Sequence, residues 1–166
     1  MPPEGQANDN QGNSQMPHNN KEAVPFLLSL VEINREKYIK DYGEEMLLKH
    51  PVAAVAERIG KISLNLDTRD PDHLAIGARL SFKVFDEKKY IAVIESINEY
   101  GILSITGNIE KSDPGFLYLS VDDENKVLAT LELPDKNAIY LLKYNHLSGN
   151  HYLFKAPLDR VKKLEY

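Results

Sequence analysis

The residues best suited to chemistry in this sequence are five histidines, because imidazole binds metals and transfers protons near neutral pH. They are His18, His50, His73, His146 and His151. The last two flank a predicted hairpin turn, so both could reach one metal ion. No third ligand follows at a recognisable spacing, and neither a His-Glu-x-x-His nor a His-x-His pattern occurs. We therefore predict no metal site.

Carboxylates are the next candidates for catalysis. Asp122, Asp123 and Glu124 share one predicted turn, and Glu44 and Glu45 are adjacent. Acid–base catalysis needs two carboxylates in different environments, which neighbours in an exposed turn do not supply. The acidic turn is also too short for a calcium loop. A hydrolase would require the fold to bring histidine and acidic side chains together in a pocket.

The sequence lacks the common catalytic and cofactor-binding motifs. It has no nucleophile elbow, phosphate loop or dinucleotide fingerprint, and it contains no cysteine. We predict a protein that is not an enzyme and that binds no cofactor. The net charge of −5 argues against nucleic acid as a partner. No apolar run approaches the roughly 18 residues of a membrane span.

Aromatic residues recur on neighbouring predicted strands. If their rings share one face, they could line a ligand groove or a protein interface. Ordinary strand propensity and cross-strand packing explain each single residue better, whereas the set as a whole favours some exposed aromatic surface. The set comprises Phe116, Tyr118, Tyr140, Tyr144, Tyr152 and Phe154.

The elements that must position these residues begin with a polar tail. Residues 1–23 contain no Val, Leu, Ile or aromatic residue, so we predict that they are disordered. Residues 24–60 read as helical, because Pro25 suits a first turn and apolar residues from Phe26 to Ile33 recur every three or four positions. Gly43 interrupts this pattern, and Gly60 is placed as a helix C-cap. The prediction is two or three short helices that cover a sheet.

From residue 61 onward the apolar period changes to two. Runs of this kind are separated by short turns at intervals of about ten residues, which is typical of consecutive antiparallel hairpins. We predict a mainly β (α+β) fold, an antiparallel meander of seven or eight strands over residues 61–166, with 24–166 as one folded unit. The meander would form a partial barrel or two packed sheets. The runs are 61–66, 78–85, 90–97, 102–109, 116–121, 127–133, 138–144 and 152–155.

The strand region carries a series of degenerate motifs in a recognisable order. A Leu-Asn-Leu strand at 64–66 precedes a Gly77 step and an apolar strand pair, followed by Gly-Asn-Ile-Glu at 107–110. An acidic turn, a Tyr-bearing strand and a Gly-Asn-His hairpin at 149–151 complete the series. Over about 95 residues this stretch resembles the N-terminal pro-region of secreted bacterial zinc metallopeptidase precursors.

The resemblance implies a domain that assists the folding of a protease or keeps it latent. A zinc metallopeptidase domain would then be the partner, and the location would be secreted or in the cell envelope. No signal peptide is visible in this chain, so a cytoplasmic location also stays open, and the oligomeric state is unknown. The predicted partner contacts are Tyr144, His146, Gly149, His151 and Tyr152 in the last hairpin, with Asp113 second.

An alternative function uses the aromatic strands instead of the hairpin. The chain would then be a stand-alone surface domain that binds a glycan or another small ligand through exposed Tyr and Phe side chains.

Overall fold

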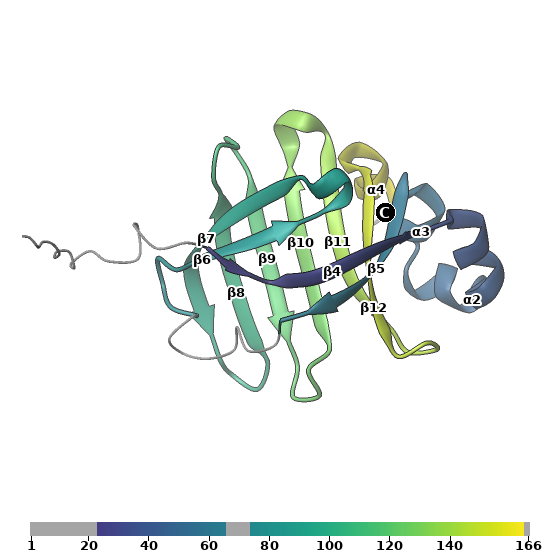
Figure 1. The fold of residues 1–166 in the computed structure, drawn as a ribbon, viewed down its shortest axis with the longest axis horizontal. Helices are drawn as coiled ribbons and strands as arrows, with labels where there is room; N and C mark the ends of the chain where they lie inside the picture. The colour runs from purple at the N-terminus through teal and green to yellow at the C-terminus, as the bar shows by residue number, and fades with distance from the viewer. Residues whose placement is uncertain (1–22, 66–73, 165–166) are drawn as a thin grey trace, which may run out of the picture.

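The computed structural model describes residues 23–65 and 74–164 and forms a nearly closed β-barrel with helices at one side (Figure 1). The described residues contain ten strands in a single sheet. They run in the spatial order β3-β6-β7-β8-β9-β10-β11-β12-β5-β4. The strands are β3 (Val24–Pro25), β4 (Leu27–Ile33), β5 (Arg58–Leu64), β6 (Arg79–Lys83), β7 (Lys89–Asn98), β8 (Leu103–Ile109), β9 (Phe116–Val121), β10 (Val127–Leu133), β11 (Ala138–Asn145) and β12 (Asn150–Pro157).

The N-terminal segment closes the barrel, because its two halves pair with opposite ends of the sheet. β3 pairs in parallel with β6, whereas β4 pairs antiparallel with β5. Phe26 lies between them: its N–H donates to the carbonyl of Ser81 (2.8 Å), and its carbonyl accepts from the N–H of Asn65 (2.9 Å). Beyond Phe26, β4 and β6 are not paired in the described part of the chain, so the closure is incomplete.

The interior is filled by alternate residues of the strands. In β10, Val127, Ala129, Leu131 and Leu133 are buried, and the residues between them face outward. The period of two in the sequence therefore corresponds to one face turned toward a common core. Phe26, Phe82 and Tyr140 extend this core across the barrel.

Helices cover only part of the outer face. α2 (Arg35–Lys49), α3 (Val52–Val55) and α4 (Leu158–Leu164) pack on the outward side chains of β5, β11 and β12. Tyr38 of α2 makes edge contacts with the rings of Tyr152 and Phe154. None of the helices in the described ranges is long and apolar enough to span a membrane.

The sequence placed the helix interruption correctly but misplaced a helix. Gly43 has non-helical angles (φ 64°, ψ −157°) within α2, as predicted. Residues 27–33, however, form strand β4, and Gly60 lies in β5 and not at a helix end. A β-bulge at Leu28 puts Leu27 and Leu30 on the same face, three residues apart, and this spacing imitates a helix. A Cβ on Gly60 would lie 2.9 Å from side-chain atoms of Leu30, so glycine lets the Leu30 side chain pack closely over β5.

The predicted barrel is confirmed, whereas the predicted strand number is wrong. The eight predicted runs correspond to β5–β12, and β3 and β4 bring the described strands to ten. The third α-helix, α4, follows the sheet and was not predicted. The predicted disordered tail lies outside the described residues, apart from residue 23.

Candidate functional site

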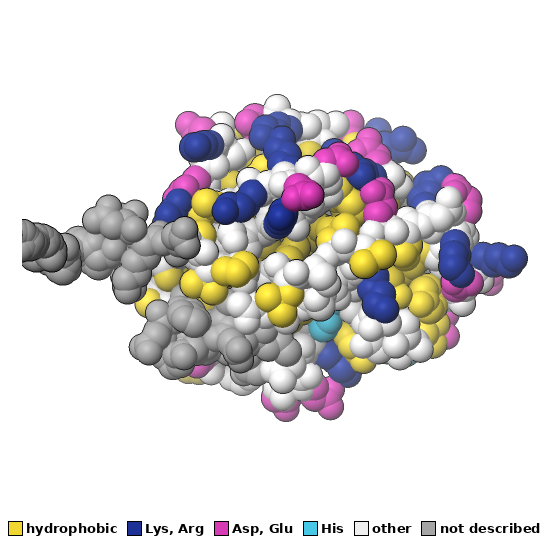
Figure 2. Space-filling model, viewed as in Figure 1, with side chains coloured by type: hydrophobic (Ala, Val, Ile, Leu, Met, Phe, Trp, Pro, Cys, Tyr) yellow, Lys and Arg dark blue, Asp and Glu magenta, His cyan; other side chains and the backbone are white. Residues whose placement is uncertain are grey.

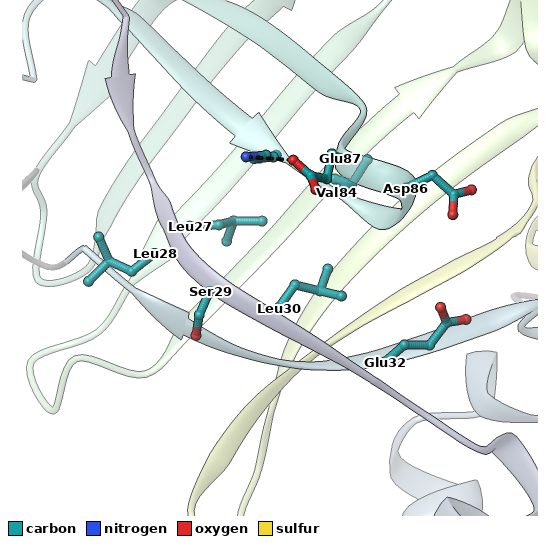
Figure 3. Close-up of a pocket in the computed structure, with 9 residues that line it drawn as sticks. Leu27, Leu28, Ser29, Leu30, Glu32, Val84, Asp86 and Glu87 are labelled. Atoms are coloured by element: carbon teal, nitrogen blue, oxygen red, sulfur yellow. Dashed lines mark ion pairs between the residues drawn. The ribbon is translucent and has the colours of Figure 1, made fainter.

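The principal candidate site is the opening between β4 and β6, which we call the seam. It contains a pocket of about 500 Å³ beside the unpaired edge of β4 (Figure 3). A free strand edge presents unpaired backbone N–H and C=O groups that another chain can use. The pocket is lined by Leu27, Leu28, Ser29, Leu30, Glu32, Lys83, Val84, Asp86 and Glu87.

The seam combines a backbone edge with apolar surface. Leu27 and Val84 are buried and form part of the barrel core, whereas Leu28 and Val31 are each 62% exposed on β4. In the space-filling view, apolar side chains lie along the diagonal band that β4 occupies, with acidic and basic side chains beside it (Figure 2). Exposed leucine and valine next to a free edge favour contact with an extended apolar segment.

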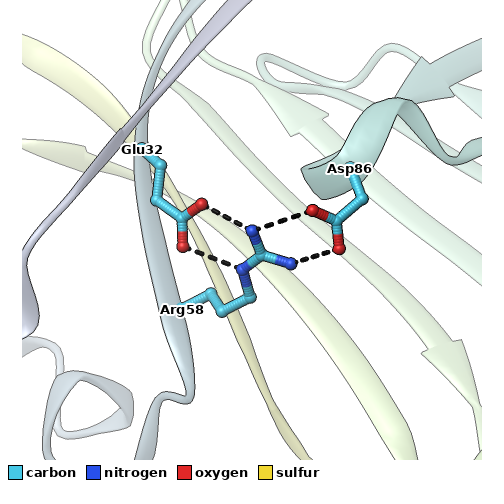
Figure 4. Close-up of polar contacts among 3 residues, drawn as sticks. All are labelled: Glu32, Arg58 and Asp86. Atoms are coloured by element: carbon cyan, nitrogen blue, oxygen red, sulfur yellow. Dashed lines mark hydrogen bonds and ion pairs between the residues drawn. The ribbon is translucent and has the colours of Figure 1, made fainter.

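One end of the seam is closed by three charged residues, Glu32, Arg58 and Asp86, which we call the clasp (Figure 4). Arg58 of β5 donates to Glu32 of β4 through Nε (2.8 Å) and Nη2 (2.5 Å). It also donates to Asp86 through Nη1 (2.5 Å) and Nη2 (3.1 Å). One guanidinium therefore joins β4 and β5 to the turn after β6.

The hydrogen bonds of the clasp shift the pKa values of all three side chains. Hydrogen bonds from Arg58 hold the pKa values of Glu32 and Asp86 below their usual range. Hydrogen bonds to Glu32 and Asp86 raise the pKa of Arg58. Both carboxylates are therefore charged at neutral pH, and acid that protonates them breaks the clasp.

The turn that supplies Asp86 has an unusual backbone. It is the 3₁₀ turn η4 (Phe85–Glu87), in which Asp86 (φ 59°) and Glu87 (φ 57°) are both left-handed. Such angles are uncommon outside glycine. The Cζ atom of Arg58 lies 4.9 Å from the centroid of the Phe85 ring. In the same turn, Nζ of Lys83 lies 3.1 Å from a carboxylate oxygen of Glu87. Arg58 thus fixes the turn by packing as well as by charge.

The predicted hairpin between β11 and β12 is present, and its turn is held to α2. Asn145 is completely buried; its side chain donates to the Tyr38 hydroxyl (3.1 Å) and accepts from the N–H groups of Leu147 and Ser148. His146 is exposed and its Nε2 lies 2.7 Å from a carboxylate oxygen of Glu45. The turn is therefore joined to α2 through both Tyr38 and Glu45.

His151 and Tyr144 face each other near a second gap in the sheet. β10 and β11 pair only between the Ala129–Leu142 pair and the turn that joins the two strands. On the other side of Ala129, the β9–β10 hairpin and the β11–β12 hairpin diverge (Figure 1). We call this gap the splay. Within it, the N–H of Val127 donates to Nε2 of His151 (2.9 Å), so the imidazole replaces a missing strand carbonyl. Burial lowers the pKa of His151, consistent with a neutral acceptor.

The other predicted contact residues occupy different environments. Tyr152 is only 3% exposed and its hydroxyl lies 3.0 Å from that of Tyr42 beneath the helices. Gly149 is exposed in the hairpin turn, with φ 76°. Asp113 is exposed in the turn between β8 and β9. The structure thus brings Tyr144 and His151 together but places Asp113 in a different turn.

The aromatic residues do not share one face. Phe116 and Tyr118 point outward from β9 and are 44% and 50% exposed. Tyr140 belongs to the barrel core, whereas Tyr152 and Phe154 lie under the helices. Only the first pair offers rings to solvent on the uncovered outer face, where Thr106 and Thr130 flank Tyr118 across the strands.

Within the described ranges, no three His, Asp or Glu side chains gather in a way that could hold a metal ion. The pKa of His50 is lowered to about 4, mainly because burial disfavours its charged form. The nearby Lys143, His146 and Lys49 lower this pKa further. His18 and His73 lie outside the described residues.

Sequence reasoning missed the seam, because its residues come from two distant segments. The only local signal is the run Val-Phe-Asp-Glu at 84–87, in which two apolar residues precede two carboxylates. Glu32 and Asp86 can share Arg58 only because the curled sheet brings β4, its last strand, back beside β6 and the turn that follows β6.

No family model matches this sequence, and no curated protein does. A solved structure described as "Structure of a chaperone-substrate complex" is similar to this chain at 14% identity and a TM-score of 0.43. The match covers 62% of this chain and 80% of that chain.

Proposed function

We propose that this chain is a non-catalytic binding domain that receives an extended segment of a partner protein along the free edge of β4. The observation that carries the proposal is the seam: an unpaired strand edge, exposed leucine and valine, and a pocket of about 500 Å³ at the same place. Addition of a strand to such an edge is an established mode of peptide recognition.

The resemblance to metallopeptidase pro-regions supplies the partner. The proposed partner is a zinc metallopeptidase, whose folding or latency the domain would control by contact through the seam. The exposed hairpin residues His146 and Gly149, and Asp113 in its own turn, stay predicted as additional contacts. Tyr152 supports the fold from beneath the helices and is left out of the proposed contact surface.

The test uses the zinc metallopeptidase encoded nearest to the gene of this chain. Leu28→Asp puts a charge on the exposed edge of the seam and should weaken binding at least about tenfold, since it removes apolar contact from the interface centre. Leu48→Asp is the matched control, because Leu48 is an exposed leucine (84%) on α2, away from the seam. Affinity is measured by isothermal titration calorimetry, and inhibition by peptidase assay.

Two results would overturn this proposal. The first is a wild-type chain that neither binds nor slows the peptidase at micromolar concentration. The second is a Leu28→Asp variant that binds as tightly as Leu48→Asp. If only His146→Ala weakened binding to the peptidase, the contact would lie at the hairpin and not at the seam.

A second candidate function is favoured by Phe116 and Tyr118. Two outward rings on one strand, flanked by threonine hydroxyls, are suited to a neutral glycan that stacks and forms hydrogen bonds. Tyrosine fluorescence titration with cellohexaose and maltohexaose tests it. Binding that Tyr118→Ala abolishes and Leu28→Asp leaves unchanged would favour this function over the first.

A further inference from the structure

The seam is bounded at both ends. At its start, the backbone of Phe26 hydrogen-bonds to Ser81 of β6 and to Asn65, which follows β5. At its other end, the clasp joins Glu32 of β4 to the turn after β6. The open edge from Leu27 to Glu32 therefore extends over roughly 15 Å, which matches about five residues of a docked strand.

The charged side chains at the rim of the seam balance, three carboxylates against three cations. Arg58 binds two of the carboxylates, and Lys83 pairs with the third. Lys155 is the register partner of Arg58 and acts electrostatically on Asp86. The carboxylates are Glu32, Asp86 and Glu87, and the cations are Arg58, Lys83 and Lys155. A charged side chain that enters the seam would lose hydration and gain no net attraction from this rim.

The floor of the seam is aliphatic and continuous with the barrel core. Leu27 is 6% exposed and Val84 is 3% exposed, and Leu30 packs against the same core. Figure 3 shows Leu27 and Leu30 on the side of β4 toward Val84, whereas Leu28 points to the opposite side. Every second side chain of a docked strand would face this floor. A polar side chain in that position would leave water for apolar neighbours, which is unfavourable.

We propose that the seam recognises an uncharged partner segment of about five residues, whose alternate side chains are aliphatic and extend the barrel core. The inference rests on the proposed function, because it names the chemistry of the segment that occupies the seam. The aliphatic floor selects the inward side chains, the balanced rim gives no preference for either charge, and the two closed ends limit the length. The central inward side chain supplies most of the selectivity, since it lies farthest from both ends.

The experiment titrates the ¹⁵N-labelled full chain with capped peptides and follows backbone amide shifts. The peptides are Ac-Val-Thr-X-Thr-Val-NH₂, with Leu, Asn, Lys or Glu at the central position X. The Leu peptide should shift the amides of β4 and of Val84 and bind about tenfold more tightly than the Asn peptide, as expected when one leucine side chain leaves water. The Lys and Glu peptides should be as weak as the Asn peptide and agree with each other within about twofold.

Two variants on the same strand test the floor. Leu30→Thr should remove most of the preference for Leu over Asn, because Leu30 faces the inserted side chain. Val31→Thr is the matched control and should leave the preference unchanged, because Val31 is 62% exposed on the outward face of β4. The wild type also gives a test that needs no variant: the methyl groups of the central leucine should show intermolecular NOEs to Leu27, Leu30 and Val84.

A lengthened peptide tests the closed ends. Three threonines added at each end of the Leu peptide should leave its affinity within about twofold, because the added residues lie outside the seam. A gain of about tenfold would show that the segment continues past Phe26 or the clasp, and the assigned length would be wrong.

The other outcomes separate the inference from the proposed function. Equal seam binding by the Leu and Asn peptides, or tighter binding by the Lys or Glu peptide, would overturn the inference and leave the proposed function standing. If the Leu peptide shifts no amide in β4, the inference is also wrong. The peptidase titration with Leu28→Asp still decides the proposed function by itself.

Discussion

In the part of the chain that the structure describes, the barrel has two gaps, the seam between β4 and β6 and the splay between β10 and β11, and they are closed by different chemistry. At the splay, a partly buried neutral imidazole accepts the N–H of Val127, and the adjoining hairpin is fixed by the buried side chain of Asn145. At the seam, a half-buried arginine joins two exposed carboxylates beside a pocket.

The difference indicates which gap is structural and which can open. Breaking a buried hydrogen bond leaves a polar group without water, which costs much of its desolvation energy. Exposed ion pairs exchange with water at little cost and weaken with salt. The splay should therefore behave as part of the core, and the seam as the place where the barrel opens to a partner.

The largest expected effect is on Asn145. Asn145→Ala removes one donor and one acceptor from a fully buried site and leaves the Tyr38 hydroxyl and two N–H groups without this partner. The free energy of unfolding in urea should fall by about 2–4 kcal/mol. The control is Asn98→Ala, because the Asn98 side chain accepts the N–H of Tyr100 at an exposed turn. This variant should change the free energy of unfolding by less than about 1 kcal/mol.

The second effect is on His151 and appears in the pH dependence of stability. Burial lowers the pKa of His151, and burial with nearby cations lowers that of His50 to about 4. The unfolded chain therefore binds more protons than the folded chain between pH 6.5 and about 4, and stability is lost as the pH falls through this window. The expected loss is about 1–2 kcal/mol.

A variant separates the contribution of His151 from that of His50. His151→Leu should lower stability at pH 7, because Val127 loses its acceptor, and should also flatten part of the pH dependence. Thermal midpoints from pH 7 to 4.5 measure both. An unchanged pH profile in this variant would show that His151 does not close the splay. Glu32 and Asp86 respond in a separate window: their pKa values are lowered, so the clasp is lost only below about pH 4.5.

The third effect is local and concerns the clasp. Arg58→Met keeps much of the side chain over Phe85 but removes all four hydrogen bonds. We expect hydrogen exchange of the amides in β4 and η4 to accelerate about tenfold while the urea midpoint changes little. Lys37→Met, which breaks an exposed pair with Asp41 on α2, is the control. If Arg58→Met lowered the free energy of unfolding as much as Asn145→Ala does, the clasp would be as important to the folded state as the buried hairpin. The proposed difference between the two gaps would then be wrong.

The smallest effect is that of salt. Raising sodium chloride to 1 M shortens the screening length to about 3 Å and should modestly accelerate exchange in β4 of the wild type. Exchange of the Val127 amide should not respond, because its bond to His151 joins two neutral groups. The salt effect on β4 should vanish in Arg58→Met. If it persists there, charges outside the clasp control the seam.

The helix predicted over residues 24–33 shows where sequence patterns mislead. A bulge at Leu28 gave β4 the apolar spacing of a helix, and the close neighbour of Gly60 is Leu30, thirty residues away in the sequence. The candidate site was harder to predict. His146 and His151 looked equivalent in the sequence, but one is exposed beside Glu45 and the other accepts a backbone hydrogen bond.

The eight strands β5–β12, the break at Gly43 and the lack of cysteine in the given sequence can all be read without a structure. These follow from local periodicity, one backbone conformation and composition, which need no knowledge of neighbours in space. The three-dimensional fold was needed to learn that β3 and β4 close the barrel, that Arg58 lies between Glu32 and Asp86, and that an imidazole fills the splay. Each of these depends on strand order and register, and contacts between residues 26 or 28 positions apart in the sequence are set by the packing of the whole sheet.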